Sequence, residues 1–260
     1  MNDILIEQVK KNLRKLYLRD MAEYLDQALD KARKEQSGHV AFLSDIVNRQ
    51  IEARERRSFE RRLKTADIPG NMTFDNFDFT FQPGLNIEYL KDLMALSFMA
   101  ERQPVLIFGK TGTGKTHISA SLGILACRAG FKVQFHSLQK LLAALYTSLA
   151  DGTTDDMITS LSRLDLLIID SIGNIRPKPE YPSLLLDLIG TCRENTAFII
   201  TSDISLEDWG AVMGDPVTTN ASIDRLLHQA HVINIRPGLS YRTQGPGAPK
   251  LPVVSSSDKL

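Results

Sequence analysis

The chain of 260 residues holds 31 basic and 31 acidic residues, so its formal net charge is zero, and 43% of its residues are hydrophobic. This composition excludes a disordered chain, and no apolar run approaches the roughly 18 residues of a membrane-spanning helix. The two cysteines, Cys127 and Cys192, form no C-x-x-C pair, which argues against a disulfide framework or a zinc site and predicts reduced thiols. Because the N-terminus lacks the apolar stretch of a signal peptide, we expect a cytoplasmic protein.

The charges are unevenly distributed along the chain, with an excess of basic residues in the N-terminal segment. Residues 1–68 carry 15 Lys and Arg against 12 Asp and Glu, whereas the remainder carries 16 against 19. Apolar residues recur at steps of three and four from Val9 to Ala32, which predicts a helix that is broken at Ser37 and Gly38. A second such pattern begins at Val40 and ends before Ile68-Pro69-Gly70. We therefore predict a small all-helical N-terminal domain over residues 1–68.

The second of these helices carries a basic cluster. Between Arg49 and Lys64 there are seven basic and three acidic residues. Taken alone, composition favours a solvated helix surface with i,i+4 pairs such as Glu52 with Arg56 over a nucleic-acid contact.

The residue pattern changes over residues 69–85, where aromatic and polar side chains alternate from Phe74 to Gln82. The segment is too short and irregular for a helix, so we predict an extended linker whose aromatic side chains pack on the following domain. Whether one of them also touches a nucleotide base stays open at this point.

From Asn86 onward helices alternate with strands. The predicted helices span residues 87–101, 116–129, 138–149, 155–161, 183–193 and 222–228, and the predicted strands span residues 105–108, 132–136, 166–170, 197–202 and 232–235. The strands read as continuous apolar runs, which is typical of a parallel sheet buried on both faces. We predict a doubly wound α/β domain over residues 86–244, followed by a disordered tail over residues 245–260 that is rich in Pro, Gly and Ser.

The first strand of this domain leads directly into a phosphate-binding loop. The octamer Gly109-Lys110-Thr111-Gly112-Thr113-Gly114-Lys115-Thr116 fits the pattern G-x-x-x-x-G-K-[ST],. Glycines let backbone N–H groups converge on phosphate oxygens, and the following helix adds partial positive charge. Lys115 is expected to neutralise the β and γ phosphates and Thr116 to offer its hydroxyl to Mg²⁺. The octamer predicts that the chain binds a nucleoside triphosphate at the carboxyl ends of the strands.

A second indication of nucleotide binding is the carboxylate at the end of the predicted strand 166–170. Asp170 follows four apolar residues, so it is expected to bind Mg²⁺ or its bound water. Hydrolytic enzymes of this class usually place a glutamate next, which polarises the attacking water, but this chain has Ser171. Either another carboxylate reaches the water, or hydrolysis is slow and ATP binding works mainly as a switch.

Two further residues each have two interpretations. Asp203 follows the strand 197–202, where it would sit beside the γ-phosphate or simply cap the next helix. Arg225 lies on an amphipathic helix; it is either a surface charge or an arginine finger that completes the site of an adjacent subunit.

These segments together resemble the AAA+ ATPases of the IstB and DnaC group, and the likeness to IstB covers most of the chain. The residues that carry it are Phe77-Asp78-Phe79-Thr80-Phe81-Gln82-Pro83-Gly84-Leu85, the phosphate-binding loop, Ala126-Cys127-Arg128-Ala129-Gly130, Asp165 to Asp170, Trp209-Gly210, Gly214-Asp215-Pro216, Asp224 to His231, and Ser240-Tyr241-Arg242. The resemblance implies an ATP-dependent homo-oligomer, a ring or spiral, that assembles on duplex DNA, deforms it and regulates a partner transposase. It also implies an AAA+ fold without a C-terminal helical lid.

The resemblance assigns roles to several residues. Lys115, Thr116 and Asp170 keep the roles given above, Asp203 matches the sensor position and Arg225 the inter-subunit finger. Because N-terminal helices of the group engage DNA or a partner protein, the resemblance favours a set of basic side chains as contacts to DNA phosphates: Arg54, Arg56, Arg57, Arg61, Arg62 and Lys64. Such contacts predict binding that depends strongly on salt and weakly on sequence.

Two alternatives stay open on the sequence. A replicative helicase loader of the DnaC kind would use the same ATPase core with N-terminal helices that bind a helicase. A small-molecule kinase would use the phosphate-binding loop for phosphoryl transfer and would need an acceptor pocket and a lid with mobile arginines.

Overall fold

The computed structural model describes residues 2–173, 175–227, 229–235 and 238–241. The chain divides after Arg61 into two compact units. Three helices make up the first unit and lead into the second: α1 (Asn2–Lys15), α2 (Arg19–Glu35) and α3 (His39–Ala66). The boundary between the units falls within α3, and the last residues of that helix belong to the second unit, where Ala66 is fully buried.

The first unit differs from the predicted single helix before Ser37. The chain turns at Leu16–Leu18, with Tyr17 in the left-handed region at a φ of 60°, so that α1 packs against α2 and Lys10 pairs with Asp26 at 2.7 Å. The sequence prediction missed this break because the apolar spacing of two helices that share one core continues across a tight turn. The predicted helix from Val40 to the end of α3 is confirmed.

The second unit is built on a five-stranded parallel sheet with the strand order β2-β3-β4-β1-β5. The strands are β1 (Val105–Gly109), β2 (Val133–Ser137), β3 (Leu166–Ile172), β4 (Ala197–Ser202) and β5 (His231–Ile235). All five residues of β1 and all six of β4 are buried, as expected for strands that helices cover on both faces.

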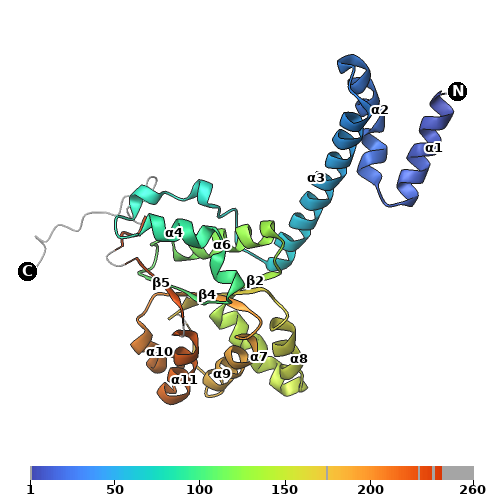
Figure 1. The fold of residues 1–260 in the computed structure, drawn as a ribbon. Helices are drawn as coiled ribbons and strands as arrows, with labels where there is room; N and C mark the ends of the chain where they lie inside the picture. The colour runs from blue at the N-terminus through green and yellow to red at the C-terminus, as the bar shows by residue number, and fades with distance from the viewer. Residues whose placement is uncertain (1, 174, 228, 236–237, 242–260) are drawn as a thin grey trace, which may run out of the picture. The chain divides into compact units, whose positions relative to one another are not determined.

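Helices cover both faces of this sheet, as Figure 1 shows, with α4 and α6 on one face and α7 to α11 on the other. Their bounds are α4 (Ile87–Met94), α5 (Ser97–Ala100), α6 (Lys115–Ala129), α7 (Leu138–Asp151), α8 (Thr154–Leu161), α9 (Tyr181–Cys192), α10 (Leu206–Met213) and α11 (Pro216–Leu227). The predicted doubly wound α/β fold is confirmed. None of the helices in the described part of the chain is long and apolar enough to cross a membrane.

Two predicted helices need correction. The helix predicted over residues 87–101 is two helices, because Leu96 adopts a left-handed φ of 60° that turns the chain so that Leu93 and Phe98 are both buried. The sequence prediction also missed α10 and started α11 too late. Asp215 accepts hydrogen bonds from the N–H groups of Val217 and Thr218 at 3.0 and 3.2 Å, and so begins α11 ahead of the predicted residue 222.

Beyond β5 the structure describes residues 238–241. The predicted disordered tail over residues 245–260 and the expected lack of a helical lid therefore concern residues outside the described part of the chain.

Candidate functional site: a phosphate-binding loop and its carboxylate

The phosphate-binding loop connects β1 to α6. Gly112 and Gly114 adopt φ values of 84° and 95°, which side chains with a Cβ rarely tolerate. A Cβ at Gly114 would also lie 2.8 Å from the Phe77 ring. The loop therefore folds this way because glycine stands at these two positions, and its backbone N–H groups can converge on an anion ahead of α6.

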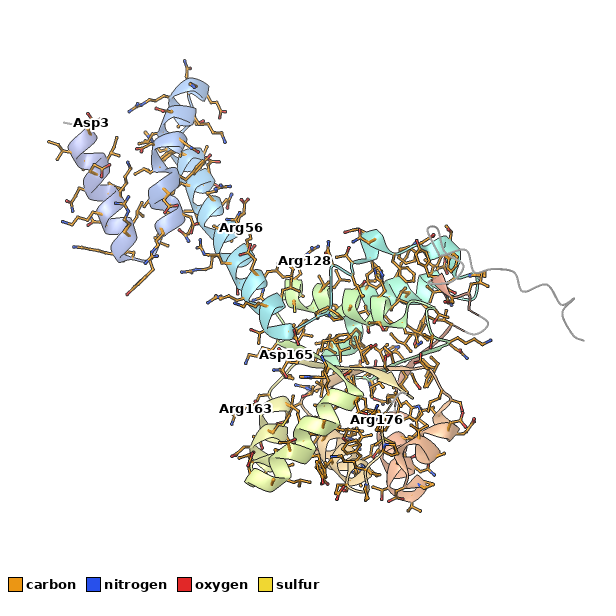
Figure 2. All side chains as sticks on the ribbon, turned by 180° about the vertical axis from the view of Figure 1, so that it is seen from behind. Asp3, Arg56, Arg128, Arg163, Asp165 and Arg176 are labelled. Atoms are coloured by element: carbon orange, nitrogen blue, oxygen red, sulfur yellow. The ribbon has the colours of Figure 1, made fainter. Side chains whose placement is uncertain are left out.

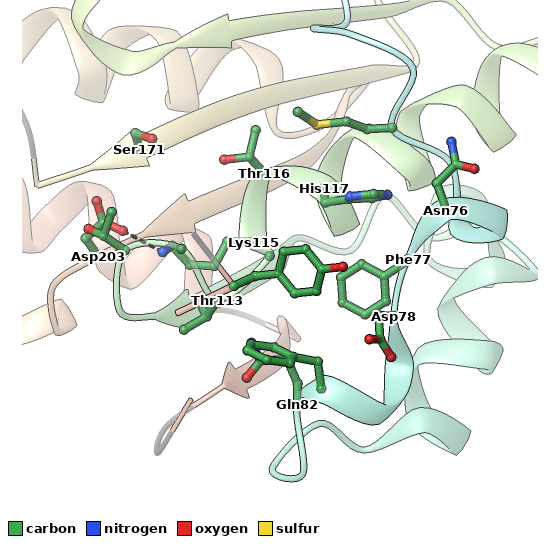
Figure 3. Close-up of a pocket in the computed structure, with 16 residues that line it drawn as sticks. Asn76, Phe77, Asp78, Gln82, Thr113, Lys115, Thr116, His117, Ser171 and Asp203 are labelled. Atoms are coloured by element: carbon green, nitrogen blue, oxygen red, sulfur yellow. Dashed lines mark ion pairs between the residues drawn. The ribbon is translucent and has the colours of Figure 1, made fainter. Parts of the chain in front are cut away.

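The loop borders a cavity of about 350 Å³. The lining combines the loop, the ends of β3 and β4, the segment 72–82 and one residue after β5: Met72, Asn76, Phe77, Asp78, Phe81, Gln82, Thr111, Gly112, Thr113, Gly114, Lys115, Thr116, His117, Ser171, Asp203 and Tyr241. Figure 3 shows the labelled members of this lining around the cavity. The cavity joins the predicted phosphate site to a wall that is largely aromatic.

Lys115 lies at the centre of the site and is 6% exposed. Its Nζ donates to the carbonyl of Lys110 at 2.9 Å and forms an ion pair of 2.5 Å with Asp203, which Figure 3 draws as a dashed line. An ammonium group has three N–H donors, so these two contacts orient Lys115 and leave a donor for a phosphate oxygen. Asp203 does not cap the next helix, because Ser205 is the N-cap of α10.

Asp170 provides a buried carboxylate beside the loop. Thr116 Oγ1 lies 3.1 Å from both of its oxygens, and Thr201 Oγ1 donates to Oδ1 at 2.6 Å. A hydroxyl and a carboxylate at this separation are hard oxygen ligands, which Mg²⁺ prefers together with water and substrate phosphate. The pair thus fits Mg²⁺ carried by a nucleotide, and the described residues contain no cluster of three or more His, Cys, Asp and Glu that would form a separate metal site.

Ser171 supports Asp170. It adopts a left-handed φ of 67°, its N–H donates to Thr201 Oγ1 at 2.8 Å and its hydroxyl donates to Asp170 Oδ2 at 3.1 Å. The carboxylates that line the cavity in the described chain are Asp78 and Asp203. Asp203 pairs with Lys115, and the Thr80 hydroxyl lowers the pKa of Asp78 by donating to it at 2.6 Å. Both carboxylates of the described lining are therefore engaged by neighbouring groups, and the position of the usual glutamate is taken by Ser171.

Arg225 is not part of this cavity. It is exposed on α11, and its Nη1 donates to the carbonyl of Leu186 at 3.4 Å. With Arg102 and Arg193 it lines a second cavity of about 140 Å³ that includes Pro104. Because Pro104 precedes β1 and the phosphate-binding loop follows it, Arg225 lies at the opposite edge of the sheet from the loop. Arg102 and Arg193 could not be singled out from the sequence, because each is an isolated basic residue.

The predicted DNA contacts fall into two groups. Arg57 forms a bidentate pair with Asp20 at 2.7 and 2.6 Å, and Arg62 donates from Nε to the carbonyl of Cys127 at 2.7 Å. Arg61 also has a partner. In contrast, the exposed side chains of Arg54, Arg56 and Lys64 enter no ion pair within the described residues; Figure 2 shows the side chains along α3, with Arg56 labelled.

The aromatic segment packs on the second unit as predicted, but it forms two 3-10 turns, Phe74–Asn76 and Phe79–Phe81, in place of an extended linker. Phe77 meets the ring of His117 edge-on at 5.2 Å, and His117 Nε2 donates to the carbonyl of Thr73 at 2.8 Å. His117 was missed in the sequence because it lies just after the loop pattern. The second turn begins at Asp78, whose side chain accepts from the Thr80 N–H at 3.0 Å.

Comparison with protein families gives this site its context. The family model described as IstB-like ATP binding protein matches residues 11–246. The chain belongs to this family. The matched residues include both the basic part of α3 and the nucleotide site. Membership of the family establishes this IstB-like chain as an ATP-binding protein.

Curated relatives of this IstB-like protein carry names that refer to insertion sequences. The chain is 34% identical over 230 residues to an IS21 putative ATP-binding protein of Pseudomonas aeruginosa, which covers 88% of this chain and 86% of the relative. It is 32% identical over 236 residues to the IS232 putative ATP-binding protein of Bacillus thuringiensis subsp. berliner, with 91% and 94% covered.

Solved structures with the same fold come from replication proteins. AMPPCP-bound DnaA from Aquifex aeolicus is 20% identical with a TM-score of 0.55, and the match covers 68% of the IstB-like chain and about half, 53%, of that chain. The DnaC helicase loader is 17% identical with a TM-score of 0.53, and 64% and 97% are covered. These likenesses show that the second unit has an AAA+ fold.

Proposed function

We propose that this IstB-like protein is an ATP-dependent oligomeric helper that assembles on duplex DNA in the cytoplasm and regulates the transposase of an insertion sequence. The observation that carries the proposal is the separation of the phosphate-binding loop from Arg225, which lie at opposite ends of the strands of one sheet. No arginine of the described residues lines the nucleotide cavity, whereas Arg225 stands exposed at the far edge with Arg102 and Arg193. Such a site is completed by the arginine of a neighbouring subunit, which stabilises charge that develops on the γ-phosphate.

We expect the same residues to hydrolyse ATP, but at a low rate. Lys115 and the loop N–H groups bind the phosphates, and Thr116 with Asp170 holds Mg²⁺. Ser171 gives the carboxylate a hydrogen bond but cannot take a proton from water at neutral pH. ATP in this protein therefore serves mainly to hold subunits together, and hydrolysis releases them slowly.

Duplex DNA is the partner that the exposed basic residues of α3 favour. Arg54, Arg56 and Lys64 present charges that the fold leaves exposed, and arginines that grip phosphates position a protein without reading sequence. The names of the relatives, which place them in insertion sequences, supply the context of a transposase. Family membership also favours this function over that of a small-molecule kinase.

Electron microscopy of the protein mixed with ATP, Mg²⁺ and duplex DNA tests this function. We expect ring or spiral particles that require both ATP and DNA, and Lys115→Ala by itself, which has no ATP at any junction, is expected not to form them. A protein that stays monomeric under these conditions would contradict the proposed assembly.

A helicase loader is the second candidate, because the fold is shared with the DnaC helicase loader. It predicts that large particles form only when a hexameric helicase is added and that duplex DNA has no effect. Particles on duplex DNA without helicase would exclude this candidate.

A further inference from the structure

Two short segments that lie far apart in the sequence meet at the nucleotide cavity. Gln82 belongs to the Phe81-Gln82-Pro83-Gly84 run, and Leu239 follows β5. Gln82 Nε2 donates to the carbonyl of Leu239 at 2.6 Å, and the Leu239 N–H donates to Gln82 Oε1 at 3.2 Å. Gln82 is only 3% exposed. Its amide thus pairs with both backbone groups of one residue and fixes the chain after β5 at two points.

The segment held by Gln82 also touches the phosphate-binding loop. The N–H of Tyr241 donates to the carbonyl of Gly112 at 2.9 Å. Gly238 lies so close to the loop that an added Cβ would be 2.7 Å from Thr113 Cγ2. Residues 238–241 therefore lie against the loop and connect it to the segment 72–82.

The Tyr241 ring lies in the wall of the nucleotide cavity. It meets Phe81 edge-on, with 4.8 Å between the ring centroids, and lines the same cavity as Phe77 and His117. The residue is 43% exposed, so part of the ring is available to a ligand. Phe81 and Gln82 are neighbours in the chain, so one turn both supports the ring and holds the backbone that carries it.

We propose that Tyr241 contacts the adenosine of bound ATP and that Gln82 is the positioning residue that holds it there. The loop N–H groups and Lys115 are suited to phosphates, whereas the aromatic part of the cavity is suited to a flat, apolar base. The inference rests on ATP binding at the phosphate-binding loop and adds the residues that distinguish a nucleotide from a bare polyphosphate.

Calorimetric titration of the full chain with two probes, MgATP and inorganic tripolyphosphate with Mg²⁺, tests the proposal. Tyr241→Ala is expected to weaken MgATP binding about tenfold, the loss of one aromatic contact, and to leave tripolyphosphate binding within about twofold. Tyr241→Phe keeps the ring and is expected to bind both probes like the parent. Tyr17→Ala, which removes an exposed tyrosine of the first unit, is the matched control.

A double-mutant cycle tests the role of Gln82. Gln82→Ala is expected to weaken MgATP binding in the parent but to add nothing to Tyr241→Ala, because both changes remove the same contact. Unchanged tripolyphosphate binding shows at the same time that the variants are folded.

Three results would overturn the proposal: equal weakening of both probes by Tyr241→Ala, no weakening of either, or full additivity of the two substitutions. Lys115→Ala separates this inference from the function on which it rests, because it is expected to weaken both probes. If Lys115→Ala left both probes unchanged, the ATP site itself would be assigned wrongly.

Discussion

Asp170 is held by three hydroxyl groups, from Thr116, Ser171 and Thr201. These three contacts fix the positions of the Asp170 oxygens beside the phosphate-binding loop, where a cation carried by a nucleotide would bind. Ser171 adds a hydrogen bond to Asp170, but unlike the usual glutamate it cannot accept a proton from the attacking water. This arrangement supports the proposal that the site binds MgATP but hydrolyses it slowly.

The substitution Ser171→Glu tests this view. A glutamate supplies the missing base, and general base catalysis contributes on the order of 100-fold in rate, so we expect steady-state phosphate release to rise by about that factor. Ser171→Ala serves as the control and is expected to change turnover by less than about threefold. Similar turnover of the Glu variant and the parent would show that another group acts as the base.

A second prediction concerns the two buried thiols and the pH dependence of stability. Burial raises the pKa of Cys127 and of Cys192 from 9.0 to about 11. A folded-state pKa above the unfolded one contributes stability that is complete below pH 9 and is lost as the pH rises through 11. We expect the free energy of unfolding in urea to fall over this window, and to fall less in the double variant Cys127→Ala, Cys192→Ala. Parallel pH profiles for parent and variant would contradict the assignment.

Single residues were predictable from the sequence where one local pattern fixes their chemistry. The spacing of the octamer is sufficient to identify Lys115 and Thr116, and a strand that ends in a carboxylate indicates Asp170. Gln82 and Tyr241 are different, because 157 residues separate Gln82 from Leu239. Their pairing depends on the turn at Asp78 and on the course of the chain after β5, neither of which leaves a periodic signal.

At the scale of elements, α3 carries two kinds of basic residue along one helix. Arg57 and Arg62 have partners within the fold, whereas Arg54 and Arg56 enter no ion pair in the described part of the chain. Sequence composition counted all of them as equal charges. The distinction depends on Asp20 and on the carbonyl of Cys127, which lie on other helices, and hence it could not be predicted from α3 alone.

This distinction can be measured with matched variants. The double variant Arg54→Ala, Arg56→Ala is expected to weaken DNA binding and to reduce the slope of log affinity against log salt by about 2, without a change in Tm. Arg57→Ala removes the bidentate pair with Asp20 and is expected to lower the free energy of unfolding of the first unit only slightly, because solvent screens an exposed ion pair. A salt slope unaffected by the double variant would exclude these two side chains as phosphate contacts.

The strands and most helices of the second unit were predictable because a buried parallel strand is a continuous apolar run. Two of the errors occur where a left-handed residue breaks a periodic pattern, at Tyr17 and at Leu96. Neither residue is a glycine, so the sequence contains no turn signal there. Packing of both flanking helices decides these turns, and packing is not visible in a local pattern.

For the whole molecule, the important relation is between the two edges of the sheet. The phosphate-binding loop lies at the carboxyl ends of the strands, and Arg225 lies with Arg102 and Arg193 at the amino ends. In the proposed oligomer, each subunit would carry one half of an ATP site at the carboxyl ends of its strands and the other half at the amino ends. Subunits that bring these two ends together would form an ATP site at every junction.

Mixing two inactive variants tests this layout. Lys115→Ala removes the phosphate contact of its own loop but keeps Arg225, and Arg225→Ala keeps the loop but cannot complete a neighbour's site. We expect each variant alone to lose at least about 90% of the DNA-stimulated ATP turnover, since an arginine finger contributes 10³-fold or more. An equal mixture is expected to recover up to roughly a quarter of the parent rate, the share of junctions that pair an intact loop with an intact arginine.

Arg163→Ala, on the helix-to-strand connection after α8, is the matched control and leaves turnover unchanged. Recovery depends on assembly, so it must vanish below the protein concentration at which particles form; a mixture no more active than its components would show that Arg225 does not act across the junction.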